Sequence, residues 1–483
     1  MFLTDIKLFS SEISLIFGAL FILLYGIFFN KSENLNKGIL YITFISLITS
    51  FYLAIFFFED NTFLFNNLLI NNSFILFFKC LMFFGTIVIV LFSYNYLNDL
   101  KILKPEYFFL ILLSLVGILI LISSNNLLSM YLGLELQSIC LYVLASYRIS
   151  SIKSSESGVK YFILGALSSG ILLYGISIIY AFTNETNFIE ISKLINFSLE
   201  NKENFLIINI GFILILCGLF FKISAVPFHM WAPDVYEGSP TSITAFFTTI
   251  PKIGAVAFLV RFLNIPFESY YDIWFQILYI VSIASMILGS IAAINQLNIK
   301  RLLAYSSISH LGFLLIGVLT ANQIGIKSIQ LYLFIYLFNL LGVFICLLSL
   351  KNKKNGFFLE DIRNFSGLLK KNSFLSISLA IFLFSLAGLP PLSGFFGKLY
   401  ILISAVESKL YFLAIIGILT SIISVFYYLK IIKYIFFDKS VNSIYIQTSF
   451  IYNFFICMSL LVSIFLIIFL SDFLEILNTS SIF

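Results

Sequence analysis

The sequence predicts an all-α polytopic membrane protein, and its composition and hydropathy pattern are the observations that predict it. Sixty per cent of the 483 residues are apolar and 11% are charged, whereas soluble domains carry roughly 25% charged residues. Apolar runs of about twenty residues recur from end to end, each long enough to cross a hydrocarbon layer of roughly 30 Å as a helix. No stretch has the composition of a separate soluble domain.

About fourteen of these runs are predicted to be membrane-spanning helices. The first is too long, and too similar to the others, to be a cleaved signal peptide or transit sequence, so we expect the chain to be inserted as made. The predicted spans are 13–29, 38–58, 74–96, 106–124, 127–147, 159–184, 205–223, 240–261, 273–294, 302–320, 328–350, 373–389, 411–437 and 449–470.

The Lys and Arg residues are distributed unevenly between alternate loops. Cations tend to stay on the side from which a membrane protein is inserted. This bias places both termini on the opposite, outer side, as an even number of spans requires, and it explains the net charge of +5 without nucleic acid. One side is predicted to hold Lys31, Lys37, Lys101, Lys104, Arg148, Lys153, Lys160, Lys300, Arg301, Lys351, Lys353, Lys354, Arg363, Lys370, Lys371, Lys430, Lys433 and Lys439, and the other Lys7, Lys193, Lys202, Arg261, Lys327 and Lys409.

The sequence lacks the residues that several functional classes require. The five cysteines lie singly in apolar runs, so there is no CxxC pair for zinc or an iron–sulfur cluster. Only His229 and His310 are present, in different contexts, which argues against a haem held between them. No glycine-rich nucleotide fingerprint follows a strand. We therefore expect no cofactor or metal in this chain, and energy must arrive as an ion gradient or through a partner protein.

Four ionisable residues lie where a bilayer penalises charge: Glu135, Lys222, Lys252 and Lys398. Each costs about 2.5–3.5 kcal/mol even on lenient insertion scales, so each needs a partner, a water-filled cavity or a function. Glu135 lies near the middle of its span, with Gln137 and Ser138 close by as hydrogen-bonding groups. A carboxyl that is kept protonated and merely tolerated is the alternative.

Two lysines lie near predicted distortions of their helices. Lys222 ends an apolar run, and Pro227 interrupts the helix five residues later. In transporters such breaks line a cavity, and a lysine beside one can exchange protons. A lysine that reaches the interface along its aliphatic stem is the alternative. Lys252 directly follows Pro251 and lies more than ten residues from either end of its run, so it cannot easily reach the interface.

A second broken helix is predicted beside Lys398, where Gly388, Pro390 and Pro391 interrupt an apolar run. Two interrupted segments in corresponding positions indicate two structural repeats. Five spans in each repeat, an odd number, would invert the second repeat and open half-channels to opposite sides. The predicted domains are residues 1–105 with three spans, 106–262 and 263–438 as the two inverted five-helix repeats, and 439–483 with the last span and tail.

His310 lies about one third of the way into its span, between the two breaks in sequence. A neutral imidazole there can relay protons, and a packing role is the alternative. His229, Asp234 and Glu237 follow the first break and are expected to be gate or fold determinants. Lys79, close to the start of its span, is expected to extend to the interface.

Acidic and basic groups at several points in the membrane, with no redox centre between them, predict a proton wire. When Glu135 and Lys222 are close, the carboxylate holds the proton on the lysine; when they separate, the proton can move on to Lys252. This switch requires Glu135 and Lys222 to lie near one another in the fold.

Five segments resemble a known family in their order and approximate spacing: YLGLELQSICLYVLAS, SSESGVKYFILGALSSGILLYG, FKISAVPFHMWAPDVYEGSPT, NIKRLLAYSSISHLG and LAGLPPLSGFFGKLY. They are similar to the antiporter-like membrane subunits of respiratory complex I, namely subunit 2 of the mitochondrial enzyme and its bacterial N-type counterpart. The family is related to multisubunit sodium/proton antiporters. The segments anchor about residues 105–405, and the rest of the chain matches mainly in hydropathy.

The resemblance implies a subunit of an H⁺-translocating NADH:ubiquinone reductase that moves protons and carries out no redox chemistry itself. It implies NADH, FMN, iron–sulfur clusters and ubiquinone in partner subunits. The implied partners are other membrane subunits of complex I, including sister antiporter-like chains, and lipids, but no nucleic acid. The implied roles are Glu135 as the carboxylate of the fifth helix, Lys222 as its partner, Lys252 as the central relay, His310 as the helix-ten histidine and Lys398 as the second-half lysine.

The sequence allows two cellular locations and two functions. The chain has the first helices that animal versions lack, and its richness in Phe, Ile, Asn and Lys indicates an AT-rich gene. We expect the mitochondrial inner membrane, with both termini facing the intermembrane space; the bacterial plasma membrane is the alternative. A sodium/proton antiporter subunit is the competing function. A passive scaffold is disfavoured. A chain with no role in transport could lose the four buried charges and avoid the free-energy cost of placing them in the bilayer.

Overall fold

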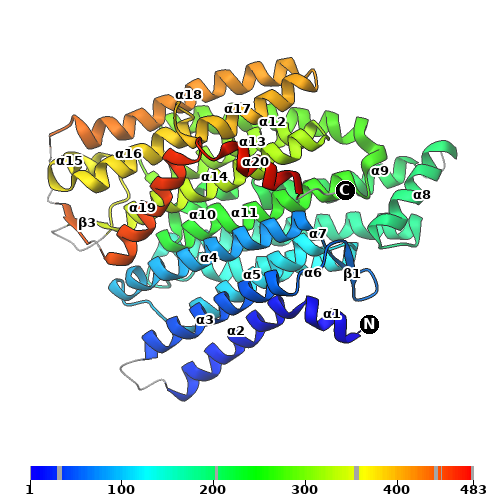
Figure 1. The fold of residues 1–483 in the computed structure, drawn as a ribbon, viewed down its shortest axis with the longest axis horizontal. Coiled ribbons are helices and arrows are strands. Elements are labelled where there is room, and N and C mark those ends of the chain that lie inside the picture. Colours follow the sequence, from blue (N-terminus) through cyan, green and yellow to red (C-terminus); the bar gives the residue numbers. More distant parts are fainter. Residues whose placement is uncertain are drawn as a thin grey trace. The chain divides into compact units, whose positions relative to one another are not determined.

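The computed structural model packs the chain into two compact units, which consist mainly of helices (Figure 1). Unit 1 comprises Met1–Ser224, Ile250–Gln276 and Ser480–Phe483, and unit 2 comprises Ala225–Thr249 and Ile277–Thr479. The structure describes residues 2–29, 35–201, 205–352, 358–439, 444–447 and 449–479. Four cations used in the orientation argument lie outside these residues: Lys31, Lys202, Lys353 and Lys354.

Unit 1 contains the helices of the first half of the chain. They are α1 (Phe2–Leu8), α2 (Ser10–Phe28), α3 (Leu35–Phe56), α4 (Ser73–Asp99), α5 (Pro105–Ser123), α6 (Leu127–Ala145), α7 (Ile152–Thr183), α8 (Phe188–Asn201), α9 (Phe205–Ile223), the second part of α11 (Thr241–Asn264) and η1 (Glu268–Tyr270). Within this unit α2 packs against α3 and α5, α5 against α6, and α7 against α9. A hairpin of β1 (Thr62–Leu64) and β2 (Leu69–Asn71) connects α3 to α4.

Unit 2 is arranged around α14. Its elements are α10 (Trp231–Gly238), the first part of α11, most of α12 (Tyr271–Ile294), α13 (Ile299–Leu319), α14 (Gln323–Leu348), β3 (Leu350–Asn352), η2 (Ile362–Phe365), α15 (Leu368–Lys371), α16 (Ser373–Ala387), α17 (Ser393–Glu407), α18 (Tyr411–Phe436), β4 (Ile444–Ile446), α19 (Phe450–Phe465) and α20 (Leu470–Thr479). Helix α14 packs against α13, α16, α17 and α19. Strand β3 pairs antiparallel with β4, which is remote in sequence.

Each predicted span coincides with a helix. Among the described residues, 12 helices are long and apolar enough to cross a membrane, or 13 if α19 and α20 form one bent span. The remaining predicted span corresponds to α16, whose 15 residues extend only about 22 Å at ~1.5 Å per residue. The last predicted span, 449–470, is not a single straight helix, because α19 ends at Phe465 and the chain turns by 94° into α20. The count of fourteen stays a prediction.

The first predicted break is confirmed. Helix α9 ends at Ile223, directly after Lys222. Ser224 then adopts a left-handed conformation with φ of 60°, and Pro227 has no N–H to continue a helix. The chain becomes helical again at Trp231, where α10 begins.

The second predicted break is also confirmed. Helix α16 ends at Ala387, and Gly388 follows with φ of 86°, a conformation that glycine adopts without a Cβ penalty. The Gly388 N–H donates to the carbonyl groups of Phe384 and Ser385 at 3.1 and 3.0 Å, which satisfies the end of the helix. The two prolines that follow prevent the helix from continuing, and α17 begins at Ser393.

Pro251 lies inside α11 without ending it. A proline cannot donate to the carbonyl group four residues earlier, here that of Phe247. The Tyr236 hydroxyl donates to this carbonyl at 3.2 Å. The freed backbone acceptor is therefore satisfied, as a membrane interior requires, and the helix continues through Lys252.

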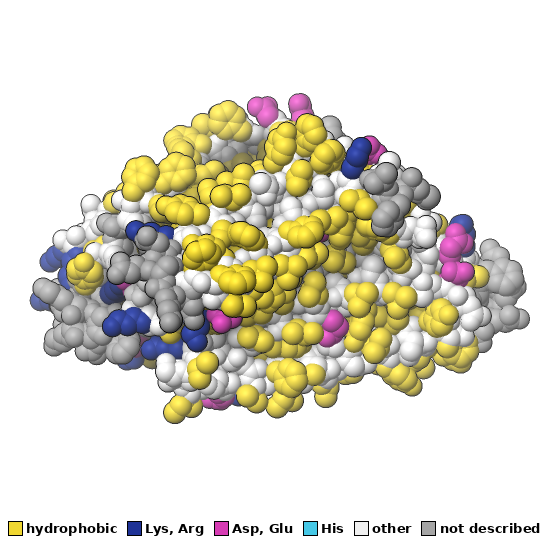
Figure 2. Space-filling model, turned by 90° about the horizontal axis from the view of Figure 1, so that it is seen from below, with side chains coloured by type: hydrophobic (Ala, Val, Ile, Leu, Met, Phe, Trp, Pro, Cys, Tyr) yellow, Lys and Arg dark blue, Asp and Glu magenta, His cyan; other side chains and the backbone are white. Residues whose placement is uncertain are grey.

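Apolar side chains dominate the face shown in Figure 2. Large ones on α2, including Phe17, Phe21 and Leu24, are more than half exposed. Buried hydroxyl groups, by contrast, mostly donate to carbonyl groups of the preceding turn of their own helix, as Thr86 and Ser93 do on α4. An apolar exterior with internally satisfied polar groups is the arrangement that lipid surroundings demand.

Lys79 does not extend to the interface, so that prediction is wrong. Its side chain is 6% exposed, and its Nζ lies 2.7 Å from Oε1 of Glu12, which is fully buried. The Ser11 hydroxyl donates to the other Glu12 oxygen at 2.6 Å, and Lys79 Nζ also donates to Asn71 Oδ1 at 3.4 Å. This ion pair joins α2 to α4. Sequence analysis missed it because the partner lies 67 residues away.

Two other cations assigned to loops are buried as well. Arg261 lies in α11, and its Nη1 donates to the carbonyl groups of Ile122 and Ser124, at the end of α5. Lys300, on α13, forms an ion pair of 2.7 Å with Glu360. Both cations satisfy groups inside the protein instead of facing water.

Replacing Lys79 by Met should destabilise unit 1 strongly, because Glu12 would remain as an uncompensated buried charge. We expect a loss of about 3–5 kcal/mol, seen as a lower unfolding temperature of the purified protein and less of the chain in the membrane. The double variant Glu12→Gln/Lys79→Met should recover most of the loss. The control is Lys160→Met, which breaks an exposed pair with Glu156 and should cost less than about 1 kcal/mol. Equal effects of Lys79→Met and Lys160→Met would contradict the assignment.

Candidate functional site

The five predicted site residues are divided between the two units. Glu135, Lys222 and Lys252 belong to unit 1, and His310 and Lys398 belong to unit 2. The three lysines and the histidine are buried, with at most 7% of each residue exposed, and Glu135 is half-buried.

Lys222 lies in the last turn of α9, beside the first break. Its Nζ donates to the Ser138 hydroxyl on α6 at 2.7 Å, and lies 5.9 Å from the centre of the Tyr142 ring, whose face attracts a cation. The carbonyl end of a helix also carries partial negative charge, which favours an ammonium group. Lys222 is thus held by α6 inside the protein and does not extend to the interface.

Glu135 lies on α6, three residues before Ser138, so both side chains are on one face of the helix. No ion pair joins Glu135 directly to Lys222, both of which the structure describes. Ser138 instead connects the Lys222 ammonium group to the turn of α6 that carries the carboxylate. The switch between Glu135 and Lys222 stays a prediction.

Lys252 lies in the densely packed part of unit 1, with 2% of the residue exposed. Two residues further along α11, Gly254 lies so close to Ile118 on α5 that a Cβ there would overlap the isoleucine side chain. Dense packing of this kind excludes bulk water, and a charge there is costly. A lysine in such a place is suited to holding a proton temporarily.

Lys398 lies in the first turns of α17, after the second break. Its Nζ donates to the Ala387 carbonyl group at the end of α16, at 2.8 Å, and lies 5.3 Å from the centre of the Phe313 ring. Lys222 precedes its break and Lys398 follows its own, and their ammonium groups have different partners: a hydroxyl group on α6 for Lys222 and the carbonyl end of α16 for Lys398. Both units therefore place a buried lysine beside a break, and only Lys398 contacts the end of a half-helix.

Gly388 leaves the space through which Lys398 reaches Ala387. A Cβ at this glycine would lie 2.8 Å from Lys398 Cδ and 3.3 Å from its Nζ. The glycine is required twice, once for its positive φ and once for the path of the lysine side chain.

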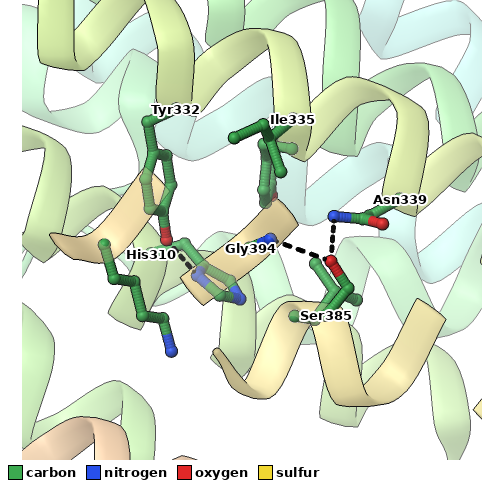
Figure 3. A pocket seen from close by; sticks show the side chains of 9 residues that line it. His310, Tyr332, Ile335, Asn339, Ser385 and Gly394 are labelled. Atoms are coloured by element: carbon green, nitrogen blue, oxygen red, sulfur yellow. Dashed lines mark hydrogen bonds between the residues drawn. The ribbon is translucent and has the colours of Figure 1, made fainter. Parts of the chain in front are cut away.

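Tyrosine hydroxyl groups surround His310. Its Nδ1 is hydrogen-bonded to the Tyr332 hydroxyl at 2.6 Å and its Nε2 to that of Tyr428 at 3.3 Å, and the ring of Tyr336 lies 5.5 Å away between centroids. Figure 3 shows the hydrogen bond between His310 and Tyr332 on α14. Sequence analysis missed these partners. The spacing of four between Tyr332 and Tyr336 in an apolar run is a signal that could have found two of them.

His310 and Lys398 line one small cavity in unit 2, of about 10 Å³, which is roughly the space that the centre of one water molecule occupies. On another part of its wall, Asn339 donates to the Ser385 hydroxyl at 2.8 Å, and the Gly394 N–H donates to the same oxygen at 3.1 Å (Figure 3). Ser385 thereby joins the end of α16 to the start of α17 and fixes the break. Imidazole, hydroxyl and ammonium groups around one cavity can pass a proton between them.

The segment after the first break is tied to α13 by charge. Arg301 Nη1 lies 3.1 Å from Asp234 and 3.2 Å from Glu237. These carboxylates hold α10 against α13, which fits a role in the fold better than a role in proton transfer.

Residues 124–424 match a family model described as NADH:quinone oxidoreductase/Mrp antiporter, transmembrane. The chain belongs to this family. A curated relative is NADH-quinone oxidoreductase subunit N of Pelagibacter ubique, 48% identical over 436 residues, or 89% of this chain and 90% of that protein. Subunit N of Bartonella bacilliformis is 43% identical over 478 residues, or 97% of this chain and 96% of that protein.

Solved structures show the same architecture. A chain of respiratory complex I from Thermus thermophilus matches with a TM-score of 0.81 and 25% identity, covering 98% of this chain and 100% of that chain. A chain of the Mrp complex from Dietzia matches with a TM-score of 0.81 at 18% identity, covering 99% and 97%, and shows the fold alone. The predicted class, an antiporter-like helical membrane protein, is confirmed.

The repeat organisation stays a prediction, with its boundaries at 1–105, 106–262, 263–438 and 439–483. The two compact units reflect how the helices pack, and they do not test whether one half of the chain repeats the other. In the last of these segments, residues 440–443, 448 and 480–483 lie outside the described residues.

Replacing Gly388 by Ala should move Lys398 away from Ala387 and lower proton transfer through unit 2. We expect proton translocation by the purified assembly in vesicles to fall by up to about a hundredfold, the rate cost of misplacing a reacting group by about 1 Å. Gly170→Ala is the matched control, because a Cβ at Gly170 meets nothing within 4 Å. A fully active Gly388→Ala protein would show that the position of Lys398 is unimportant.

Proposed function

We propose that this chain is an antiporter-like, proton-translocating membrane subunit of an NADH:quinone oxidoreductase, whose redox chemistry takes place in other chains. The observation that carries the proposal is its similarity, over about nine tenths of both chains, to subunits N of that enzyme. The buried acid and base groups supply a matching chemistry, because they can bind and release protons.

In unit 1, Glu135, Ser138 and Lys222 act as the switch. The carboxylate favours a proton on Lys222, and Ser138 holds the ammonium group at a fixed point on α6. A neighbouring charge that draws Glu135 away removes this stabilisation, and the proton then passes towards Lys252. Because Lys222 is bonded to a hydroxyl group rather than locked in a direct ion pair, releasing its proton requires no ion pair to be broken.

In unit 2, Lys398 and His310 exchange protons around their shared cavity. Tyr332 and Tyr428 keep both ring nitrogens of His310 hydrogen-bonded, so the imidazole can accept a proton on one side and release it on the other. The Ala387 carbonyl group favours the charged form of Lys398 and thereby sets the point at which a proton is held.

The proposed partners are other membrane subunits of complex I, including sister antiporter-like chains, with lipids around them. NADH, FMN, iron–sulfur clusters and ubiquinone are assigned to partner subunits. The relatives described above come from bacteria, which supports the bacterial plasma membrane, the alternative location. The mitochondrial inner membrane and the outward-facing termini stay predictions.

A subunit of a sodium/proton antiporter is the second candidate. The family description includes Mrp antiporters, and the Dietzia Mrp chain shares the fold. That likeness is limited to 18% identity, whereas identity to the subunits N reaches 48%. The first candidate is therefore preferred.

Association with redox chains separates the two candidates. The experiment is to tag the chain, solubilise its membrane gently and follow NADH:quinone reductase activity through native separation. Co-migration of this activity with the tagged chain as one large assembly is expected. A chain found without that activity, in an assembly that exchanges sodium for protons, would overturn the proposal in favour of the antiporter.

Lys222→Met and Glu135→Gln should each lower proton pumping and coupled NADH oxidation while the complex still assembles. Removing one positioned acid or base should cost at least about tenfold in rate, measured in vesicles that contain the purified complex. The control is Glu190→Gln/Lys193→Met, which removes an exposed Glu–Lys pair on α8 and should leave both rates unchanged. Unchanged proton transfer in an assembled Glu135→Gln/Lys222→Met double variant would refute the switch.

A further inference from the structure

A groove lies in unit 2 between the last residues of α12 and the last turns of α18. Its volume is about 740 Å³, far larger than the cavity at His310. Phe426, Leu429, Ile432 and Phe437 supply apolar walls, and Lys430, Lys433 and Tyr434 bring polar groups between them. A groove with apolar walls and two cations fits a ligand that has both an apolar chain and an anionic head.

The cations of the groove are not neutralised within the protein. Lys430 Nζ donates to the Ile294 carbonyl group at 3.1 Å, and Lys433 is exposed. Neither ammonium group forms an ion pair with a carboxylate among the described residues. The single acid between residues 411 and 439 is Asp438, against three lysines in that segment. Both lysines therefore keep their charge available for an external anion.

An exposed apolar stripe on α18 leads directly to these cations. Ile415, Leu419, Ile422, Phe426 and Leu429 are each more than 40% exposed. Their spacing of four and three residues keeps them on one face of the helix, and Lys433 continues the same face. From Ile415 to Leu429 the stripe extends about 21 Å at ~1.5 Å per residue, which is long enough to span the hydrocarbon layer of one leaflet, about 15 Å thick.

We propose that this groove binds an anionic phospholipid, with its phosphate between Lys430 and Lys433 and one acyl chain along the exposed stripe of α18. Two unneutralised lysines at the end of a stripe long enough to span one leaflet match the charge and the length of such a lipid. Tyr434 supplies a hydroxyl donor at the depth of the glycerol esters, where tyrosine is favoured in membrane proteins. Attraction between the two lysines and an anionic head group distinguishes this lipid from a neutral one.

The test uses the complete assembly that contains this chain, reconstituted in phosphatidylcholine vesicles with a small fraction of phosphatidylglycerol carrying a photoreactive group in one acyl chain. After illumination, mass spectrometry locates the labelled peptides. Labelling of α18 is expected, and Lys430→Gln/Lys433→Gln should lower it by about tenfold or more. Lys370→Gln/Lys371→Gln is the matched control, because it removes two exposed lysines outside the groove, and it should leave labelling unchanged.

Three results would overturn the proposal. One is equal labelling of α18 by a phosphatidylcholine probe, which would show a non-selective apolar surface. Another is loss of the label when inorganic phosphate is added, which would indicate a site for free anions. The third is absence of labelling together with cross-linking of a photoreactive residue at position 426 to another protein, which would show that a subunit covers the groove.

Discussion

The structure depends on the contact between a lysine ammonium group and the carbonyl end of a broken helix. A bilayer interior penalises charge and also penalises free carbonyl groups. Placing the two together relieves both costs, because the carbonyl groups gain a donor and the ammonium group gains partial negative charge. Lys398, on α17, uses this arrangement at the end of α16, whereas Lys222, in the last turn of α9, donates to the Ser138 hydroxyl on α6.

Other features of the fold preserve that arrangement. Gly388 turns the chain and leaves room for Lys398, and Ser385 bonds to the Gly394 N–H across the break. In α11 the Tyr236 hydroxyl replaces the hydrogen bond that Pro251 cannot make, so the helix that carries Lys252 remains intact. Each device satisfies a backbone group at a place where Pro or Gly interrupts or distorts regular structure beside a buried lysine. A stable fold and an ionisable interior are therefore compatible in this chain.

Much of this architecture follows from local sequence signals. The spans follow from the length of apolar runs, and both breaks follow from Pro and Gly near Lys222 and Lys398. These signals act within a few residues, so one sequence is enough to recognise them. The positions of the five predicted site residues inside helices or at their breaks follow for the same reason.

What the sequence left out depends on contacts between distant segments. Glu12 meets Lys79 from another helix, and the tyrosines around His310 come from α14 and α18. No pattern within one helix specifies which helix will be its neighbour. Ser138 was noted as a possible partner of Glu135 but bonds Lys222 instead, a contact between residues 84 positions apart in sequence. The bend between α19 and α20 occurs with neither Pro nor Gly at the break, and we have no physical account of it.

The most direct test of the central claim, that protons pass through buried side chains of this chain, concerns Lys252. It is the least exposed of the three candidate lysines. A water molecule is therefore least able to take over its role in proton transfer. The measurement is the number of protons translocated per NADH oxidised, in vesicles containing the complex with Lys252→Met or the unmodified chain. We expect the Lys252→Met complex to assemble, its proton translocation to fall sharply and its NADH oxidation to slow as well. An assembled Lys252→Met complex with unchanged rates of both processes would show that protons do not pass through Lys252.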